Sequence, residues 1–366
     1  MQTLSVMLLV LMLLPVVFSL SFMPYLTRET ISFGVTVNEE TYRSEPLRRM
    51  RRAYATLSLS LYAVLFLACL LGVLRFGGAE AQFTIFAIGI GIMVVISIVL
   101  NIVFHLNMKK RLPSLPSTPA EKSKVVIDTG FRRNKLTWSN AWFLVHAAII
   151  AGCVLLTLAN YDAIPDQIAM KFDFAGNVTR FADKTMLTAL FPNFMQVVMT
   201  LLFLFINWSI NHSKQQTYAG DPERSVRQST LFRRNWSLYT LISGLAMVLL
   251  FSFIQLNMLY PMDTDLIMLV SLAVPVFIVL FAAILSFITG QGGSRLGRKQ
   301  GPSAVQPAND DRYWKLGGLY YNPQDPSIFV EKRMGIGWTL NFAHPVGWII
   351  LGGVLIVIAV AAIISG

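Results

Sequence analysis

The stretch YDAIPDQIAMKFDFAGNVTRFADK, Tyr161–Lys184, indicates the fold of this chain most clearly. It is polar and turn-rich and lies between two long apolar runs. Apolar and polar residues alternate along 167–174, which is typical of a β-strand. Gly176 and Asn177 then provide a turn before Val178–Phe181. The stretch therefore predicts a short β-hairpin between two membrane-spanning helices.

The composition indicates a membrane protein. Of 366 residues, 55% are hydrophobic and only 13% are charged, whereas soluble domains carry about 25% charged residues. The net charge is +11, but basic residues of membrane proteins collect in cytoplasmic loops. Because the basic residues are spread over several loops without an aromatic RNA-reading motif, we predict no binding to nucleic acid.

Eight apolar runs are long enough to cross a bilayer, which takes about 17 to 25 residues. None of them contains Asp, Glu, Lys or Arg. The predicted spans are 3–23, 54–74, 83–105, 142–160, 187–210, 238–259, 266–289 and 346–364. The predicted fold is an all-α integral membrane protein of about eight transmembrane helices, with a small extracytoplasmic β-hairpin loop and a docked cytoplasmic segment.

The positions of lysine and arginine predict the orientation. The first, third, fifth and seventh loops together hold 26 of these residues and the other loops hold 4, which accounts for all 30. Loops rich in lysine and arginine lie on the cytoplasmic side. We therefore expect a bacterial cytoplasmic membrane protein with both termini and the 161–184 hairpin outside the cytoplasm.

The apolar runs and the loops divide the chain into six regions. They are a three-span region with basic cytoplasmic loops at 1–139, a two-span unit with the outer hairpin at 140–211, a second two-span unit at 212–289, a flexible tether at 290–311, a cytoplasmic aromatic segment at 312–345 and the last span at 346–366. The tether is predicted from its Gly-rich, Ser-containing composition.

The aromatic segment 312–345 is rich in turn signals, and Ile328–Val330 reads as a strand. Residues 335–342 are expected to lie along the membrane interface. Two interpretations stay open: the segment binds a cytoplasmic protein, or it is a plug that covers the helix ends. The candidate partner residues are Trp314, Tyr320, Tyr321, Asn322, Pro323, Asp325, Pro326, Lys332, Arg333, Trp338 and Asn341.

The order helix, Ile164–Ile168, Phe172, Gly176, Arg180–Phe181, helix resembles a bacterial membrane domain found at the front of SdpI-type toxin-immunity proteins. The resemblance covers about 140–211, and the loop of that family usually reads LPxxIPxHFxxxGxxDxW. The segment before the last span also resembles one that often closes proteins of the same family. The resemblance implies toxin immunity or protection against envelope stress.

This chain departs from the family loop at three positions: Ala169 replaces a proline, Lys171 a histidine and Thr179 an acid. If the family's histidine does chemistry, this chain does not share it, whereas Pro165, Phe172 and Gly176 are enough to keep a structural hairpin. The candidate recognition residues are Pro165, Asp166, Lys171, Phe172, Asp173, Gly176 and Arg180.

The sequence offers no catalytic, cofactor or metal motif. Its four histidines show no HExxH spacing and its two cysteines no CxxC. We therefore predict a non-enzymatic protein that binds an extracytoplasmic peptide or lipid. The alternative is a transporter or a transport accessory, which would show a polar cavity in the membrane lined by Asn101, His146 and Gln196.

Overall fold

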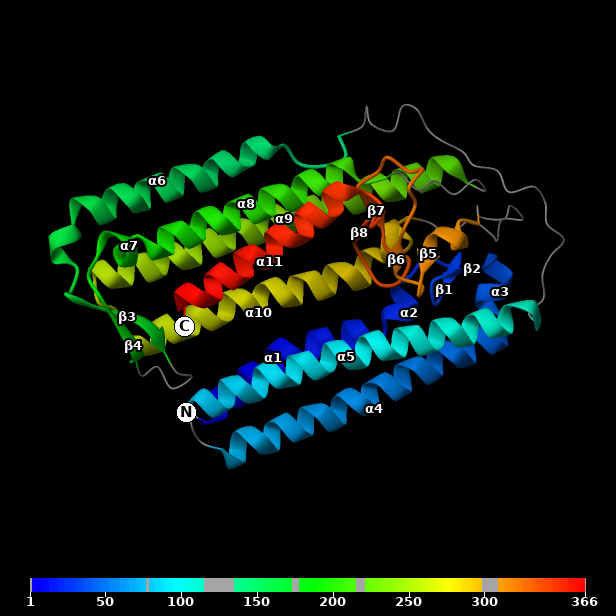
Figure 1. Ribbon diagram of the computed structural model, residues 1–366, viewed down its shortest axis with the longest axis horizontal. Helices are drawn as coiled ribbons and strands as arrows, with labels where there is room; N and C mark the ends of the chain where they lie inside the picture. The colour runs from blue at the N-terminus through cyan, green and yellow to red at the C-terminus, as the bar shows by residue number, and fades with distance from the viewer. Residues whose placement is uncertain are drawn as a thin grey trace.

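The computed structural model describes residues 2–76, 79–114, 135–172, 178–214, 221–297 and 309–365, and the long helices lie side by side in an elongated bundle (Figure 1). Within this part of the chain, six helices are long and apolar enough to cross a membrane. They are Glu45–Arg75, Thr84–Arg111, Asn140–Ala159, Phe191–His212, Pro222–Leu259 and Thr264–Gly293, and two shorter apolar stretches are Val10–Ser21 and Pro345–Ile356. These are the helices of a multipass membrane protein and imply contact with the lipid bilayer.

Successive long helices run in alternating directions along the bundle (Figure 1). They are α1 (Gln2–Ser21), α4 (Glu45–Arg75), α5 (Ala79–Arg111), α6 (Phe143–Ala159), α8 (Phe191–His212), α9 (Pro222–Leu259), α10 (Thr264–Thr289) and α11 (Pro345–Ser365). Helix α9 packs on α6, α8 and α10, while α4 packs on α1 and α5. The contact between α1 and α10 joins these two groups.

Several helices extend beyond the predicted spans at one end of the bundle. Helix α4 begins at Glu45 rather than at 54, and α9 begins at Pro222 rather than at 238. The first turn of α9 is capped by Asp221, whose Oδ1 accepts a hydrogen bond of 3.1 Å from the Arg224 amide. These polar turns carry basic side chains beyond the apolar part of the helices.

The small elements gather at opposite ends of the bundle (Figure 1). One end, called the hairpin end, holds β3 (Gln167–Phe172), β4 (Val178–Asp183) and α7 (Met186–Ala189). The other, called the docking end, holds α2 (Met23–Leu26), β1 (Ile31–Ser32), β2 (Val35–Thr36), α3 (Glu39–Arg43), η5 (Gln291–Gly293), β5 (Trp314–Lys315), β6 (Leu319–Tyr320), β7 (Phe329–Glu331) and β8 (Trp338–Leu340). Residues 312–345, called the closing segment, thus meet parts of the first and fifth loops.

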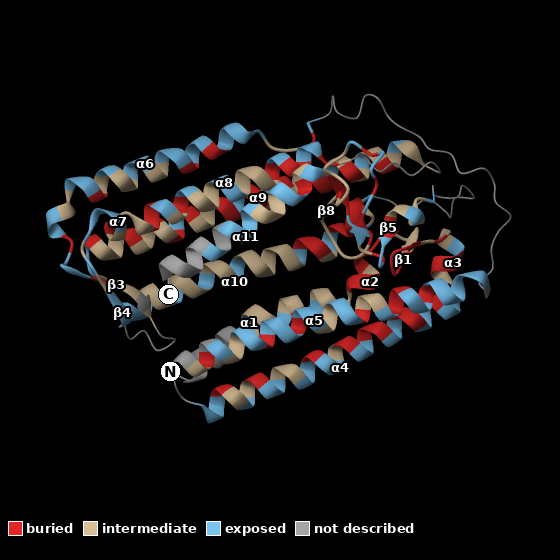
Figure 2. Ribbon diagram, in the orientation of Figure 1, coloured by how far each residue is buried: buried red, intermediate tan, exposed pale blue. Residues whose placement is uncertain are grey.

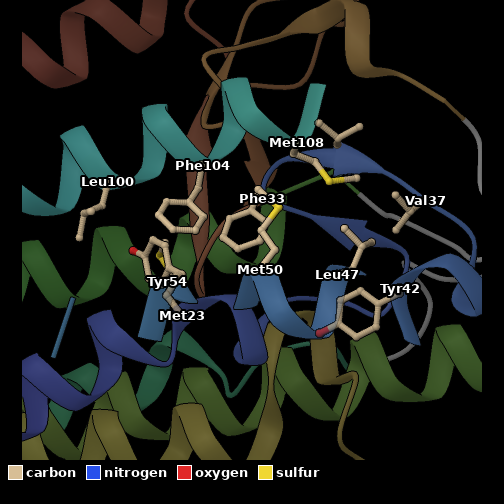
Figure 3. Close-up of a cluster of buried hydrophobic side chains, with 11 residues drawn as sticks. Met23, Phe33, Val37, Tyr42, Leu47, Met50, Tyr54, Leu100, Phe104 and Met108 are labelled. Atoms are coloured by element: carbon tan, nitrogen blue, oxygen red, sulfur yellow. The ribbon is translucent and has the colours of Figure 1, made fainter. Parts of the chain in front are cut away.

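Burial is densest at the docking end, whereas the outer faces of the long helices are mostly exposed (Figure 2). The largest buried cluster lies between α4 and α5 at this end (Figure 3). Phe104 stacks with Phe33 and meets the edge of Tyr54, with ring centroids 5.3 and 5.1 Å apart. The loop that carries β1 and β2 is therefore part of the folded core and not a free connection.

The structure corrects two sequence expectations. The described residues form four two-stranded antiparallel sheets, not one hairpin. One of these sheets contains residues 338–340, which pair with β7 as strand β8. The predicted tether is folded at its start, because glycines with positive φ at 290, 292 and 293 allow a tight turn against α9; 298–308 lie outside the described residues.

Candidate functional site

The predicted hairpin forms at the hairpin end. Strands β3 and β4 pair antiparallel from Gln167 opposite Asp183 to Phe172 opposite Val178, with irregularities between Ala169 and Phe172. Ala169 and the two positions after it thus interrupt a regular ladder. The predicted turn at Gly176–Asn177 lies outside the described residues.

A small apolar cluster attaches the hairpin to the bundle. Ile164 and Ile168 pack with Ala189 and Leu259, and all four are buried. Lys184 reinforces this attachment, since its Nζ donates to the Ile164 carbonyl at 2.7 Å and its amide donates to the Asp166 carbonyl at 2.8 Å. The hairpin is thus held at its base.

The predicted recognition residues have different places on this hairpin. Pro165, Asp166 and Arg180 are exposed and Phe172 is half-buried. Asp173, Gly176 and the side chain of Lys171 lie outside what the structure describes. Phe181, which the sequence analysis did not select, is 55% exposed next to Arg180. The exposed residues of the hairpin therefore include charged groups and an aromatic ring, with Arg180 and Phe181 on opposite faces of β4 because successive strand residues alternate.

The docking end is organised around a buried carboxylate that the sequence analysis did not select. Glu331, at the end of β7, is fully buried. Its carboxylate pairs with Arg28 of the first loop and lies 3.8 Å from Nη2 of Arg233 in α9. Arg233 is also fully buried and donates to the carbonyls of Ile210 and Lys214 at 2.8 and 3.0 Å. One acid thus joins three loops.

A second buried cation joins the closing segment to β1–β2. Arg333 is 3% exposed and pairs with both Asp310 and Asp311. It also donates to the Gly34 carbonyl at 3.0 Å, while Asp311 accepts a 2.7 Å bond from the Thr36 hydroxyl. Because buried charges are tolerated only when they are paired and hydrogen-bonded, this arrangement fixes both loops together.

A third connection runs from the end of α8 to the closing segment. Lys214 Nζ lies 2.6 Å from Asp325 Oδ2, which also accepts a 2.7 Å bond from the Tyr320 hydroxyl. Burial disfavours the ionised form of Asp325, but the hydrogen bonds from Lys214 and Ser327 outweigh it, so the pKa of Asp325 lies below its usual value. The carboxylate is therefore charged when it holds Lys214.

Gln291 holds the closing segment through hydrogen bonds of its uncharged side-chain amide. Its Nε2 donates to the carbonyls of Lys332 and Gly337, both at 3.0 Å, and its Oε1 accepts a 2.8 Å bond from the Gly337 amide. The amide side chain thus satisfies backbone groups in the turn between β7 and β8. Residues 290–293 are consequently a docking element.

Most of the predicted partner residues of the closing segment lie in the interior of the chain. Six are buried: Trp314, Tyr320, Asn322, Asp325, Arg333 and Asn341. Trp338 is half-buried, and the exposed ones are Tyr321, Pro323, Pro326 and Lys332. Asn341 illustrates the role of the buried residues, since its Nδ2 donates to the carbonyls of Asn322 and Asp325 at 2.9 and 3.0 Å. The buried six hold the fold, and only Tyr321, Pro323, Pro326 and Lys332 of the predicted set are exposed.

The three residues that a transport cavity would use have separate partners. Asn101 accepts a 2.9 Å bond from the Tyr54 hydroxyl between α4 and α5. Gln196 donates to Ser252 at 2.8 Å on α9, and His146 packs edge-on against Phe143. In the described residues, no group of three His, Cys, Asp or Glu side chains could hold a metal ion.

Two short parts of the chain match protein families. Residues 148–196 match a domain of unknown function (DUF1648), which is the domain found in SdpI-like proteins. Residues 323–348 match a family of unknown function (DUF5808). The predicted resemblance of the two-span unit is thus confirmed over 148–196. No curated protein and no solved structure matches the chain.

Proposed function

We propose that this chain is a non-enzymatic protein of a bacterial cytoplasmic membrane that protects the cell by binding an extracytoplasmic peptide through the β3–β4 hairpin. It spans the membrane eight times, with both termini and the hairpin outside the cytoplasm. This protection takes the form of toxin immunity or resistance to envelope stress. The alternative ligand of the same hairpin surface is an extracytoplasmic lipid.

The hairpin surface carries the proposal. Its base is fixed by Ile164 and Ile168, while the side chains of Asp166 at that base and of Arg180 and Phe181 on β4 are exposed. Interfaces that bind peptides or proteins are enriched in aromatic residues and arginine. The apolar side chains that anchor the hairpin are thus different from the exposed side chains that the proposal assigns to the ligand.

The geometry of the loops supports the proposed orientation. The first, fifth and seventh loops carry most of the lysine and arginine, and Arg28, Arg233 and Glu331 bring these three loops together at one end. The hairpin lies at the opposite end (Figure 1). An end rich in basic residues is expected in the cytoplasm, which supports the proposal that the hairpin lies outside.

The test is protection of a sensitive bacterial strain against a panel of membrane-active peptides. Expression of the chain is expected to raise survival for at least one peptide. The triple variant Asp166→Ala/Arg180→Ala/Phe181→Ala is expected to lose this protection at equal abundance in the membrane. Equal survival with and without the chain over the whole panel rejects the protective function.

A matched control uses an exposed ion pair far from the hairpin. Glu45 and Arg49 lie at the docking end, 3.1 Å apart, and both are exposed. The variant Glu45→Ala/Arg49→Ala removes two charges like the triple variant but leaves the hairpin intact. It is expected to protect as well as the wild type; if both variants lose protection equally, the hairpin is not the recognition surface.

A further inference from the structure

The tip of the β5–β6 hairpin carries exposed leucines on an unusual backbone. Leu316 has a φ of +50° and is 50% exposed, and Leu319 is 47% exposed. A residue other than glycine is uncommon in this left-handed region and costs free energy there. Burial within the chain does not offset this free energy, because half of the Leu316 side chain is exposed. The exposed part can therefore contact the solvent or the membrane.

Close contacts fix the tip against α5. A Cβ atom on Gly317 would lie 2.6 Å from His105 Nδ1, and one on Gly34 would lie 2.5 Å from the Gly317 carbonyl oxygen. His105 is oriented in turn, since its Nδ1–H donates to the Phe33 carbonyl at 2.7 Å. The tip therefore has a defined height along α5, at the level of His105.

That height corresponds to the boundary of the apolar part of α5. His105 closes the predicted span 83–105, and the exposed Lys109 and Lys110 follow one turn later. Val103 just before His105 and Leu106 just after it are 43% and 47% exposed. The order from apolar helix surface to leucines to lysines follows the order of acyl chains, interface and headgroup phosphates in a bilayer.

We propose that the β5–β6 tip and the last turn of α5 form an interfacial site for an anionic phospholipid. Leu316 and Leu319 enter the boundary of the acyl region, while Lys109, Lys110 and the exposed Lys315 bind the headgroup phosphate. Charge complementarity favours an anionic lipid, and the height of the leucines favours a lipid over a soluble ligand. The site lies at the docking end and is independent of the hairpin proposed above.

The experiment compares the full chain in phosphatidylcholine nanodiscs with and without phosphatidylglycerol. It measures the unfolding temperature and, by native mass spectrometry, the anionic lipid retained on the released protein. The wild type is expected to gain stability and to retain phosphatidylglycerol. In Lys109→Ala/Lys110→Ala/Lys315→Ala, the affinity for that lipid is expected to fall roughly fivefold per charge removed.

Leu316→Gly separates a lipid contact from a purely structural role. Glycine adopts positive φ without strain, so the variant is expected to be at least as stable as the wild type in detergent. In nanodiscs it is expected to lose part of the stability gained from phosphatidylglycerol. Arg75→Ala, at the other end of α4, is the charge control and should keep the full gain.

Three results overturn the proposal. The first is a full phosphatidylglycerol gain in the lysine variant, and the second is a full gain in Leu316→Gly. The third is an equal loss in Arg75→Ala, which would show that any basic residue near the membrane has the same effect.

Discussion

The hairpin end and the docking end are attached to the same bundle by different physical means. The β3–β4 hairpin rests on a few apolar side chains around Ile168 and leaves Asp166, Arg180 and Asp183 exposed. The closing segment instead buries the charges that attach it, with Glu331 and Arg333 at or below 3% exposure. Exposed charges contribute little to stability and stay available to a ligand, whereas buried charges cannot lose a partner without a large cost. The difference separates a surface suited to recognition from a segment required for folding.

The largest loss of stability is expected from Glu331→Ala, which tests whether the closing segment is required for folding. The substitution leaves Arg233 buried without its carboxylate, and breaking a buried pair in this way costs about 3–5 kcal/mol. Chemical unfolding of the solubilised full chain measures the loss. Glu45→Ala removes an exposed pair and is expected to cost at most about 1 kcal/mol. Equal stability of Glu331→Ala and the wild type would show that the closing segment is not part of the folded unit.

The next effect concerns the backbone contact between the closing segment and α5. Gly317→Ala places a Cβ atom against His105 at a φ of +76°, which is expected to cost about 1–3 kcal/mol of unfolding free energy. Gly318→Ala is the matched control, because a Cβ atom there meets nothing within 4 Å. Similar unfolding free energies for the two variants would contradict the close docking of this tip.

A smaller effect is expected from pH. Because the folded protein lowers the pKa of Asp325, its charge stabilises the fold above the ordinary value of 3.8. This contribution is lost as the pH falls through the lowered pKa. Lys214 is 41% exposed, so the contribution is discounted to about 1 kcal/mol. Asp325→Asn should therefore be less stable than the wild type near neutral pH, and its unfolding free energy should decline less steeply in acid. Parallel profiles of unfolding free energy against pH for the two proteins would show that the Lys214–Asp325 contact does not stabilise the fold.

The smallest effect on stability is expected at the hairpin surface. Phe181 is exposed, so Phe181→Ala should change the unfolding free energy by at most about 0.5 kcal/mol. Ile168→Ala, on the buried side of the same hairpin, should cost about 2–4 kcal/mol by leaving a cavity. A loss for Phe181→Ala as large as that for Ile168→Ala would mean that the exposed face is structural too, and the contrast between the two ends would fail.

The sequence predicts the hairpin end better than the docking end, for a physical reason. Period-two alternation and turn residues are local signals, and they locate β3 and β4 close to their observed bounds. Glu331 and Arg233 become partners only when two loops distant in sequence meet, and no local pattern reports that meeting. Hydropathy also misses the first turns of α4 and α9, because those turns are helical and polar.

The closing segment shows the same limit for site residues. Its aromatic and turn residues mark a structured region, and the strand at 328–330 is close to the observed β7. The pattern does not distinguish side chains that contact a partner from those that hold the segment in place. Asn341 is a polar residue that composition assigns to the surface, yet it is fully buried and bonds two backbone carbonyls.

Hydrogen–deuterium exchange of the solubilised full chain tests the contrast between the two ends most directly. Exposed, weakly attached elements open at low free energy, whereas elements built into the core exchange only on larger unfolding. We predict slow exchange for the amides of 329–331 and 338–341 and faster exchange for those of 167–172 and 178–183. Exchange in the closing segment as fast as in the β3–β4 hairpin, or faster, would contradict the account.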